Sequence, residues 1–491
     1  MSELQAELSE EQLQAIERER ALRINEGLKG SDLHRGMVET SGPRSTPFRI
    51  SPEPVYIDRR LYEELVALGP HLRAFYEAAN RLYLQSVRGS QPGWVREYLD
   101  RGKSETVVDY QRMRRFRTAL PAIIRPDVIP TEDGIVISEL DSVPGGFGLL
   151  AAISREYAEL GFDLVGGADG IAQGFWEAIR SLVPQVADPV CAIVVSDESD
   201  AYRGEMEWLS RHLASEGKRI YTAHPRQLLY TEEGVYVPDP EGECELFGTA
   251  CRRVDVVYRF FELFDLKNIP KIDLLLYAVR KELVQMTPPI KSHLEEKLLM
   301  ALLHHGALGS FWQDQMGHRS YEVCRRVFPE SWIVDPRPLP PHAVIPGLEM
   351  GGRPVSDWRQ LKSARQRERE LVLKPSGYSP EAWGSRGVMI GHDLPAEEWA
   401  EGIEKALASF ETTPYVLQRF HKGRRFEVKY FDFDEGRVKS MGARLRLCPY
   451  YFCVGEETKL GGVLATACSL EKKVIHGMAD AVMAPVAVAE G

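Results

Sequence analysis

Two short segments of the chain carry charged side chains at alternating positions. Arg125 and Asp127 belong to the first segment, Glu139 and Asp141 belong to the second, and residues 131–134 between them read Thr-Glu-Asp-Gly, a turn sequence. Successive side chains on a strand point to opposite faces, and facing residues on paired strands lie about 5 Å apart. We therefore expect a hairpin that gathers three carboxylates and one arginine.

Three carboxylates held this closely repel one another unless a cation lies among them. Mg²⁺ is a suitable cation because it is usually bound by one or two protein carboxylates together with substrate phosphates. The residue types thus predict a magnesium site at Asp127, Glu139 and Asp141. On this segment alone, an exposed hairpin with hydrated charges explains the pattern equally well.

A lysine at the end of an apolar strand gives a second signal. Lys374 closes the predicted strand 371–374, and a loop of small residues follows with Gly384, Ser385 and Gly387. An ammonium group and backbone N–H groups in such a loop can surround phosphates, and glycine lets the backbone come close to them. A plain hairpin remains the simpler alternative.

Two further residues have both a functional and an ordinary explanation. Lys297 precedes the apolar helix 298–303 and can point inward toward an anion, although most helical lysines are hydrated at the surface. Gln418 lies near the end of the apolar strand 415–420, whose edge can bind a purine through backbone groups or simply form part of the core.

Other candidates are less specific. We expect Arg444 and Arg446, which alternate on a late strand, to face phosphates, and Gly145 and Gly146 to form either an anion-binding loop before a helix or a turn. Four arginines are candidates for holding a carboxylate substrate or are ordinary surface and structural residues: Arg203, Arg252, Arg253 and Arg259.

The order of these parts resembles the circularly permuted ATP-grasp ligases, most closely the synthetase domain of glutathionylspermidine synthase. The family's Arg-x-Asp and Glu-x-Asn motifs are matched by Arg125-Pro-Asp127 and Glu139-Leu-Asp141, and its two nucleotide lysines by Lys297 and Lys374. The resemblance covers roughly residues 105–470. It departs at Asp141, where the family has Asn, and no amidase domain precedes the ligase part.

The resemblance implies an α/β (α+β) protein with a permuted ATP-grasp fold, an inserted pre-ATP-grasp-like α/β domain and a helical N-terminal region. It also implies an ATP- and Mg²⁺-dependent carboxylate–amine ligase that forms an amide through an acylphosphate and releases ADP. Arg125 would stabilise the transferring phosphoryl group, while Lys297, Lys374, Gly384, Ser385, Gly387 and Gln418 would bind ATP. The alternatives are another ATP-dependent phosphoryl-transfer enzyme on this fold and a non-catalytic scaffold.

Composition limits the partners. The 491 residues carry a net charge of −11, which argues against nucleic acid, and no apolar run is long enough to span a bilayer. The 7 cysteines are scattered, and no secretory signal is visible, so we expect a cytoplasmic protein with free thiols. The resemblance implies a small carboxylate and an amine of the amino acid, peptide or polyamine class as substrates. We also consider a homodimer.

Changes in composition along the chain suggest its division. Short apolar runs at 190–195, 219–222 and 254–258 alternate with helical patterns, which predicts a parallel sheet. The stretch 265–303 is expected to be mostly helical with a break at Thr287-Pro288-Pro289, and the Ala/Val-rich end is expected to be a loosely held helix. The predicted parts are the helical region 1–104, the metal-binding part 105–186, the α/β domain 187–285, the nucleotide-binding part 286–470 and the tail 471–491.

Overall fold

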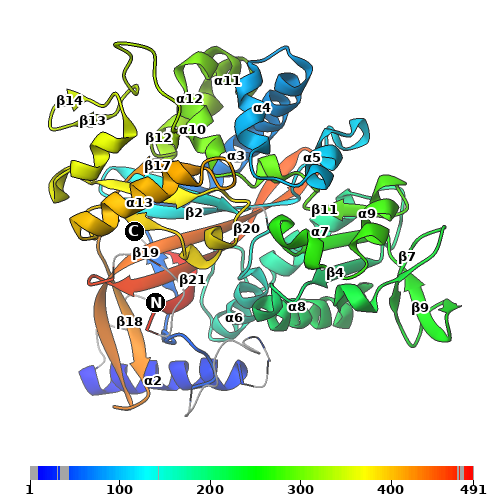
Figure 1. Ribbon diagram of the computed structural model, residues 1–491. Helices are drawn as coiled ribbons and strands as arrows, with labels where there is room; N and C mark the ends of the chain where they lie inside the picture. The colour runs from blue at the N-terminus through cyan, green and yellow to red at the C-terminus, as the bar shows by residue number, and fades with distance from the viewer. Residues whose placement is uncertain are drawn as a thin grey trace.

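The computed structural model describes residues 9–29, 31, 33, 44–141, 143–472, 475 and 480–489. Some predicted positions lie outside these residues, namely Ser142 in the motif after Asp141, the start of the helical region and parts of the tail. The described chain is a mixed α/β protein in which strands from distant parts of the sequence share one large sheet (Figure 1).

The largest sheet has seven strands and carries the predicted hairpin at one edge. Its order is β1-β21-β20-β19-β2-β3, and β18 pairs with the first half of β19. The second half of β19 pairs with β2, so strands late in the sequence support the hairpin. The bounds are β1 Val55–Ile57, β2 Ile123–Thr131, β3 Gly134–Asp141, β18 Phe426–Asp432, β19 Arg437–Val454, β20 Glu457–Ser469 and β21 Val482–Val488.

The expectation of a helix in the tail is wrong. Residues 482–488 form β21, which pairs with β20 on one side and β1 on the other. Val482, Ala484 and Val486 alternate along this strand and are buried, which is the period of a strand rather than a helix. Pro485 also disfavours a helix interior because it lacks an N–H donor.

The predicted parallel sheet is present. Its order is β11-β10-β4-β5, all pairs are parallel, and every residue of β4 is buried. Its strands are β4 Cys191–Val195, β5 Ile220–Ala223, β10 Val256–Phe260 and β11 Gln285–Thr287. An antiparallel sheet that we did not predict extends from this region, with strands β6 Leu229–Tyr230, β7 Val235–Pro238, β8 Cys244–Leu246 and β9 Thr249–Arg253.

A third sheet carries Lys374 and Gln418. Its order is β12-β17-β15-β16, and its apolar side packs under the helix α13 with Leu373, Trp399 and Leu417 in the core. The bounds are β12 Ser331–Val334, β15 Leu371–Pro375, β16 Met389–Ile390, β17 Tyr415–Arg419 and α13 Ala396–Ala408, and a short hairpin, β13 Glu349–Met350 with β14 Arg353–Pro354, lies nearby.

The helices surround these sheets, and the longest is α3 (Arg59–Arg88). The carboxylate of Asp58 caps its first turn by accepting from the N–H of Leu61 at 2.8 Å, and Gly89 ends it in a left-handed conformation. Among the described residues, no helix is long and apolar enough to cross a membrane. The others are α2 Glu10–Gly27, α4 Gly93–Asp100, α5 Glu105–Arg112, α6 Phe147–Glu159, α7 Gly170–Ser181, α8 Arg203–Ser215, α9 Ile272–Arg280, α10 Leu298–His304, α11 Gly309–Met316 and α12 His318–Val327.

The stretch 265–303 is helical on both sides of the predicted break at Thr287-Pro288-Pro289. Helices α9 and α10 lie within it, but residues 285–287 form β11 at the edge of the parallel sheet. The segment between β11 and α10 contains the Pro288-Pro289 pair, which excludes a continuous helix. The chain therefore passes from the parallel sheet to Lys297 through extended backbone and a short 3₁₀ turn at Ser292–Leu294.

Candidate active site

The β2–β3 hairpin brings its charged residues together. Asp127 lies opposite Glu139 in the strand register, and Arg125 lies opposite Asp141, with an irregularity just after Asp127. The Nη2 atom of Arg125 is 3.1 Å from Oδ1 of Asp127 and 2.9 Å from Oδ2 of Asp141. One guanidinium thus joins two of the three carboxylates. Its Nη1 also donates a hydrogen bond to the Gly145 carbonyl, which fixes its orientation.

The two aspartates differ in their electrostatic surroundings. Burial alone would raise the pKa of Asp127, but the guanidinium groups of Arg125 and Arg446 hold that pKa below its ordinary value. Arg446 Nη1 lies 3.2 Å from Asp127 Oδ2, and the thiol of Cys448 donates to Oδ1 at 3.4 Å. At Asp141, burial raises the pKa, Arg125 opposes this, and the charges of Glu139 and Asp127 add to the rise.

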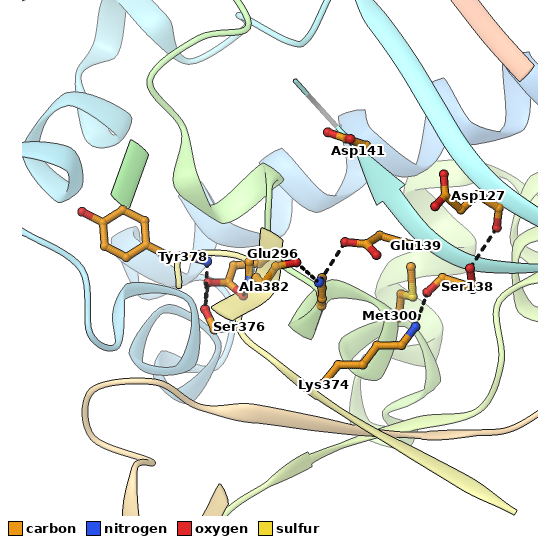
Figure 2. A network of polar contacts seen from close by, with 12 residues as sticks. Asp127, Ser138, Glu139, Asp141, Glu296, Met300, Lys374, Ser376, Tyr378 and Ala382 are labelled. Carbon is orange, nitrogen blue, oxygen red and sulfur yellow. Dashed lines mark hydrogen bonds and ion pairs between the residues drawn. The ribbon is translucent and has the colours of Figure 1, made fainter. Parts of the chain in front are cut away.

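Two lysines reach the hairpin from other elements. Lys374 on β15 donates through Nζ to the Ser138 carbonyl at 2.6 Å (Figure 2). It also donates to Gln418 Oε1 at 2.9 Å. Lys297, which immediately precedes α10, has its Nζ 2.8 Å from Glu139 Oε1 and donates to the Ala382 carbonyl at 3.3 Å. Both ammonium groups therefore converge on β3.

Burial lowers the pKa of Lys374 to about 8, the charge of Glu139 opposes this shift, and repulsion from Lys297 adds to it. The side chain is 7% exposed and has a carbonyl and an amide oxygen as its partners, rather than a carboxylate. An anion that entered beside it would find an ammonium group without a neutralising counterion.

A buried glutamate that sequence reasoning missed holds the loop after Lys374. Glu296 Oε1 accepts from Ser376 Oγ at 2.6 Å and from Lys103 Nζ at 2.5 Å, and Oε2 accepts from the Gly377 N–H at 3.3 Å. A Cβ atom at Gly377 would lie 2.0 Å from the Glu295 carbonyl oxygen, so only glycine fits this approach. In the sequence, only the position of Glu296 next to Lys297 indicated that this glutamate belongs to the site.

The predicted glycine loop is partly helical. Residues Pro380–Ser385 form a 3₁₀ helix, and the Gly387 N–H donates to the Glu381 carbonyl at 2.8 Å. A Cβ atom at Gly387 would lie 2.8 Å from Cγ of Pro375, so the loop folds closely over the end of β15. The surroundings of Gly384 and the side chain of Ser385 lie outside what the structure describes.

Of the two explanations for Gln418, the structure shows the core strand and not the strand edge. β17 is an inner strand, where Gln418 is paired with Ser331 on β12 and with Val372 on β15. Beyond it, the N–H groups of Arg419 and Phe420 donate to the carbonyls of Glu330 and Glu370. The amide side chain instead accepts from Lys374 and donates to Ser331 Oγ at 3.3 Å. Its observed contacts therefore orient Lys374.

The Gly145-Gly146 loop does not present a free anion site. Both oxygens of the buried Glu205 accept from the start of α6, Oε1 from the Gly146 N–H and Oε2 from the Leu149 N–H, each at 2.8 Å. The carboxylate of Glu205 thus occupies the position at the start of α6 where a ligand anion could otherwise bind. Burial raises the pKa of Glu205 to about 7, although these N–H groups oppose the shift.

A cavity of about 1000 Å³ lies between the large sheet and the sheet that contains Lys374. Such a volume is at the upper end of small-molecule sites. Its walls combine apolar side chains such as Val372, Ile390 and Phe420 with charged side chains of both signs. The charged lining includes Asp127, Glu139, Lys374, Arg419, Lys422, Arg444 and Arg446, so both late arginines that we expected near phosphates face this space.

The Asp141 end of the hairpin has acidic neighbours from the parallel-sheet region. Burial raises the pKa of Glu262 to about 8, and the charges of Glu295 and Asp141 add to the rise. Glu295 forms an ion pair with the fully buried Arg259. The side chain of Glu262 has no hydrogen bond or ion pair with any residue that the structure describes, while its carbonyl accepts from the Asp265 N–H.

The candidate carboxylate-binding arginines are mostly engaged within the protein. Arg259 donates to the carbonyls of Pro288 and Phe261 in addition to its ion pair. Arg203 pairs with Asp200 at 2.5 Å, and Arg252 pairs with Asp239 at 2.7 Å. These contacts explain the three residues as structural. For Arg253, the structure gives only its place at the end of β9, paired with Tyr236 on β7.

The comparisons with known proteins reveal the fold but no family. No protein-family model matches the chain, and no curated protein matches it. A glutathione synthetase-like effector from Globodera pallida, solved in its apo form, superposes with a TM-score of 0.56 at 14% identity, covering 96% of this chain and 97% of that one. A Methylobacillus flagellatus structure named for gamma-glutamylcysteine synthetase gives a TM-score of 0.37 at 11% identity, over 79% and 81% of the two chains.

The chain therefore shares the overall fold of a glutathione synthetase-like protein, which is consistent with an ATP-grasp-like fold and with the mixed α/β class expected from the sequence. The second likeness is too weak to carry an argument. The closer resemblance to the synthetase domain of glutathionylspermidine synthase, the permuted order and the division into domains stay predictions.

Proposed function

We propose that this protein is an ATP- and Mg²⁺-dependent carboxylate–amine ligase on a circularly permuted ATP-grasp fold. The observation that carries the proposal is the convergence of Lys297 and Lys374 on the carboxylate hairpin, beside a cavity lined by further cations. Two cations from separate elements, aimed at one acidic hairpin, suit a triphosphate held beside a metal. The fold shared with a glutathione synthetase-like protein agrees with this assignment.

The donor atoms of the hairpin are of the kind that Mg²⁺ binds. Asp127, Glu139 and Asp141 offer hard carboxylate oxygens, which Mg²⁺ prefers. Arg125, Arg446 and Lys297 lie within 3.2 Å of these oxygens, so the site already concentrates negative charge that requires cations. A bound Mg²⁺ would supply further neutralisation of charge on the phosphates during transfer.

The protein's own residues perform the remaining tasks. Lys374 and Lys297 would hold the phosphates, with Gln418 fixing the orientation of Lys374. Backbone N–H groups of the loop with Gly384, Ser385 and Gly387 would cover the phosphates and exclude water, which competes with the amine for the acylphosphate. Arg125 would stabilise charge on the transferring phosphoryl group from its place between the two aspartates.

The acidic residues near Asp141 give the amine a binding place. Glu262 has no partner within the described chain and lies close enough to Glu295 and Asp141 for their charges to raise its pKa. A protonated amine would relieve this repulsion, so a cationic amine of the amino acid, peptide or polyamine class fits better than a neutral one. After loss of its proton, the amine would attack the acylphosphate and displace phosphate.

The test is an ADP-release screen in which small carboxylates and amines are supplied in pairs. We expect ADP and phosphate to appear only with a matching pair, and the amide product to be found by mass spectrometry in equal amount. Phosphate transfer without any amine would favour another phosphoryl-transfer enzyme. Absence of ATP–Mg²⁺ binding by calorimetry would favour a scaffold.

A further inference from the structure

Three potential metal ligands lie together far from the hairpin in sequence. His212 and Glu216 are one helical turn apart at the end of α8, and Asp169 immediately precedes α7. One ligand atom from each residue lies within 4.8 Å of the other two. None of the three residues lines the large cavity.

The central histidine has an unusual contact geometry. Its Nε2 atom is 3.5 Å from Asp169 Oδ1 and 3.5 Å from Glu216 Oε1. These separations exceed the usual 2.7–3.2 Å of an N–H···O hydrogen bond. The same atom is buried and has no hydrogen-bond partner among the described residues, although its side chain is 12% exposed.

The separations match those between ligands of a tetrahedral zinc ion. Zinc lies about 2.0–2.1 Å from imidazole nitrogen and about 2.0–2.2 Å from carboxylate oxygen, so adjacent ligands are about 3.3–3.5 Å apart. An imidazole with two carboxylates also suits zinc better than magnesium, which prefers oxygen ligands. A water molecule would complete the four ligands, as it does in zinc sites with three protein donors.

Neighbouring residues hold the three side chains in place. Trp208 stacks on the His212 ring with 5.2 Å between centroids and 17° between planes. The loop before α7 lies against β20, since a Cβ atom at Gly166 would come within 1.9 Å of the Gly461 carbonyl oxygen. Arg155 donates to the same Asp169 oxygen that faces His212, which leaves Oδ2 as the alternative donor to an ion.

We propose that Asp169, His212 and Glu216 bind one zinc ion, separate from the magnesium site of the hairpin. The ion would connect α8, which flanks the parallel sheet, to the loop that packs on β20 of the large sheet. Its role would be structural, because the residues lie outside the cavity and no candidate catalytic group is among them. The proposal does not depend on the ligase function.

The test is zinc binding to the full chain by equilibrium dialysis and elemental analysis, with Zn²⁺ as the only added metal. We expect His212→Gln to lose one zinc equivalent relative to the wild-type protein, and the rise in Tm with zinc to be lost in the same variant. His318→Gln, which changes an exposed histidine, and Glu139→Gln, at the hairpin, should both keep that equivalent. Retention of all zinc by His212→Gln would overturn the proposal.

A thiol pair is the main competitor for zinc. Cys244 Sγ and Cys251 Sγ lie 3.0 Å apart on β8 and β9. The dialysis is therefore repeated with Cys244→Ser/Cys251→Ser, which should bind as much zinc at the His212 site as the wild-type protein. A loss of the His212-dependent equivalent in this double variant would assign it to the thiols and contradict the proposal.

Discussion

Two neighbouring positions of the β2–β3 hairpin differ in their charged surroundings although Arg125 joins them: Asp127 marks the cavity end and Asp141 the acidic end. Asp127 faces a cavity whose lining includes Lys374, Arg444 and Arg446, and two guanidiniums lower its pKa. Asp141, on the opposite strand, has the acidic neighbours Glu262 and Glu295, and its pKa is raised. Two guanidinium groups therefore adjoin Asp127, whereas further carboxyl groups adjoin Asp141.

This difference suits a reaction between an anionic nucleotide and a cationic amine. Phosphates would be held at the cavity end, while the amine would be held among the acidic residues beyond Asp141. The hairpin would place both within reach of one carboxylate substrate. Variants that act on one end and leave the other unchanged test whether the two ends have different functions.

The largest expected effect is at Glu139, which lies opposite Asp127 and pairs with Lys297. We expect Glu139→Ala to lower ADP-forming turnover by at least about 100-fold, since an electrostatic group aimed at transferring phosphate is lost. The control Glu232→Ala changes an exposed carboxylate in the turn between β6 and β7, which does not line the cavity, and should leave turnover nearly unchanged. Full activity in Glu139→Ala would contradict the assignment of the hairpin.

A smaller effect is expected at the acidic end. Because the pKa of Glu262 is raised to about 8, Glu262→Gln removes a negative charge only above about pH 8, where the KM for the amine should rise by about 10-fold, which equals about 1.4 kcal/mol. The KM for ATP should stay the same, because Glu262 does not line the cavity. Glu245→Gln, an exposed residue on β8, serves as the control. Equal changes in both KM values would remove the distinction between the ends.

The cavity end should depend on pH. The pKa of Lys374 is lowered to about 8, so the free protein loses this proton as pH rises through about 8, whereas bound phosphate favours the ammonium form. ATP affinity should therefore fall above pH 8, by at most about tenfold per pH unit, with uptake of a proton on binding. Calorimetry in buffers of different ionisation enthalpy measures both the ATP affinity and the proton uptake. Lys374→Arg stays charged and should flatten the slope.

The smallest effect concerns the loop that follows Lys374. Gly377→Ala would place a Cβ atom 2.0 Å from the Glu295 carbonyl oxygen, so the free energy of unfolding should fall by about 1–3 kcal/mol. Urea unfolding measures the change. Gly306→Ala is the control, since nothing lies within 4 Å of its added Cβ atom and its φ is not positive. Equal stability of the two variants would show that the loop tolerates a side chain.

Local patterns in the sequence predicted much of the fold. Alternating charges on the hairpin, the buried run of β4 and the apolar stripe of α3 each reflect a short-range rule, and the corresponding elements are present. The likeness to a glutathione synthetase-like protein supports the same class of fold. The prediction of a helix in the tail was wrong because the Ala content suggested a helix, whereas pairing with β20 and β1 determines the structure of this segment.

The missed parts of the site depend on long-range contacts. Glu296 holds the loop through contacts with Lys103, Ser376 and Gly377, which come from distant segments of the chain. Gln418 looked like a strand edge because nothing in the sequence shows that β12 pairs beside it. Glu205 likewise reaches the start of α6 from another helix. Such partners follow from topology and not from spacing.

The central claim is that the carboxylate hairpin is the metal half of an ATP site. Calorimetric titration of the full chain with ATP, with and without Mg²⁺, tests it most directly, using the wild-type protein and Glu139→Gln. We expect Mg²⁺ to strengthen ATP binding by at least about tenfold in the wild-type protein, and this gain to be lost in the variant. ATP binding that is absent, or that is equally strong in both proteins with and without Mg²⁺, would contradict the claim.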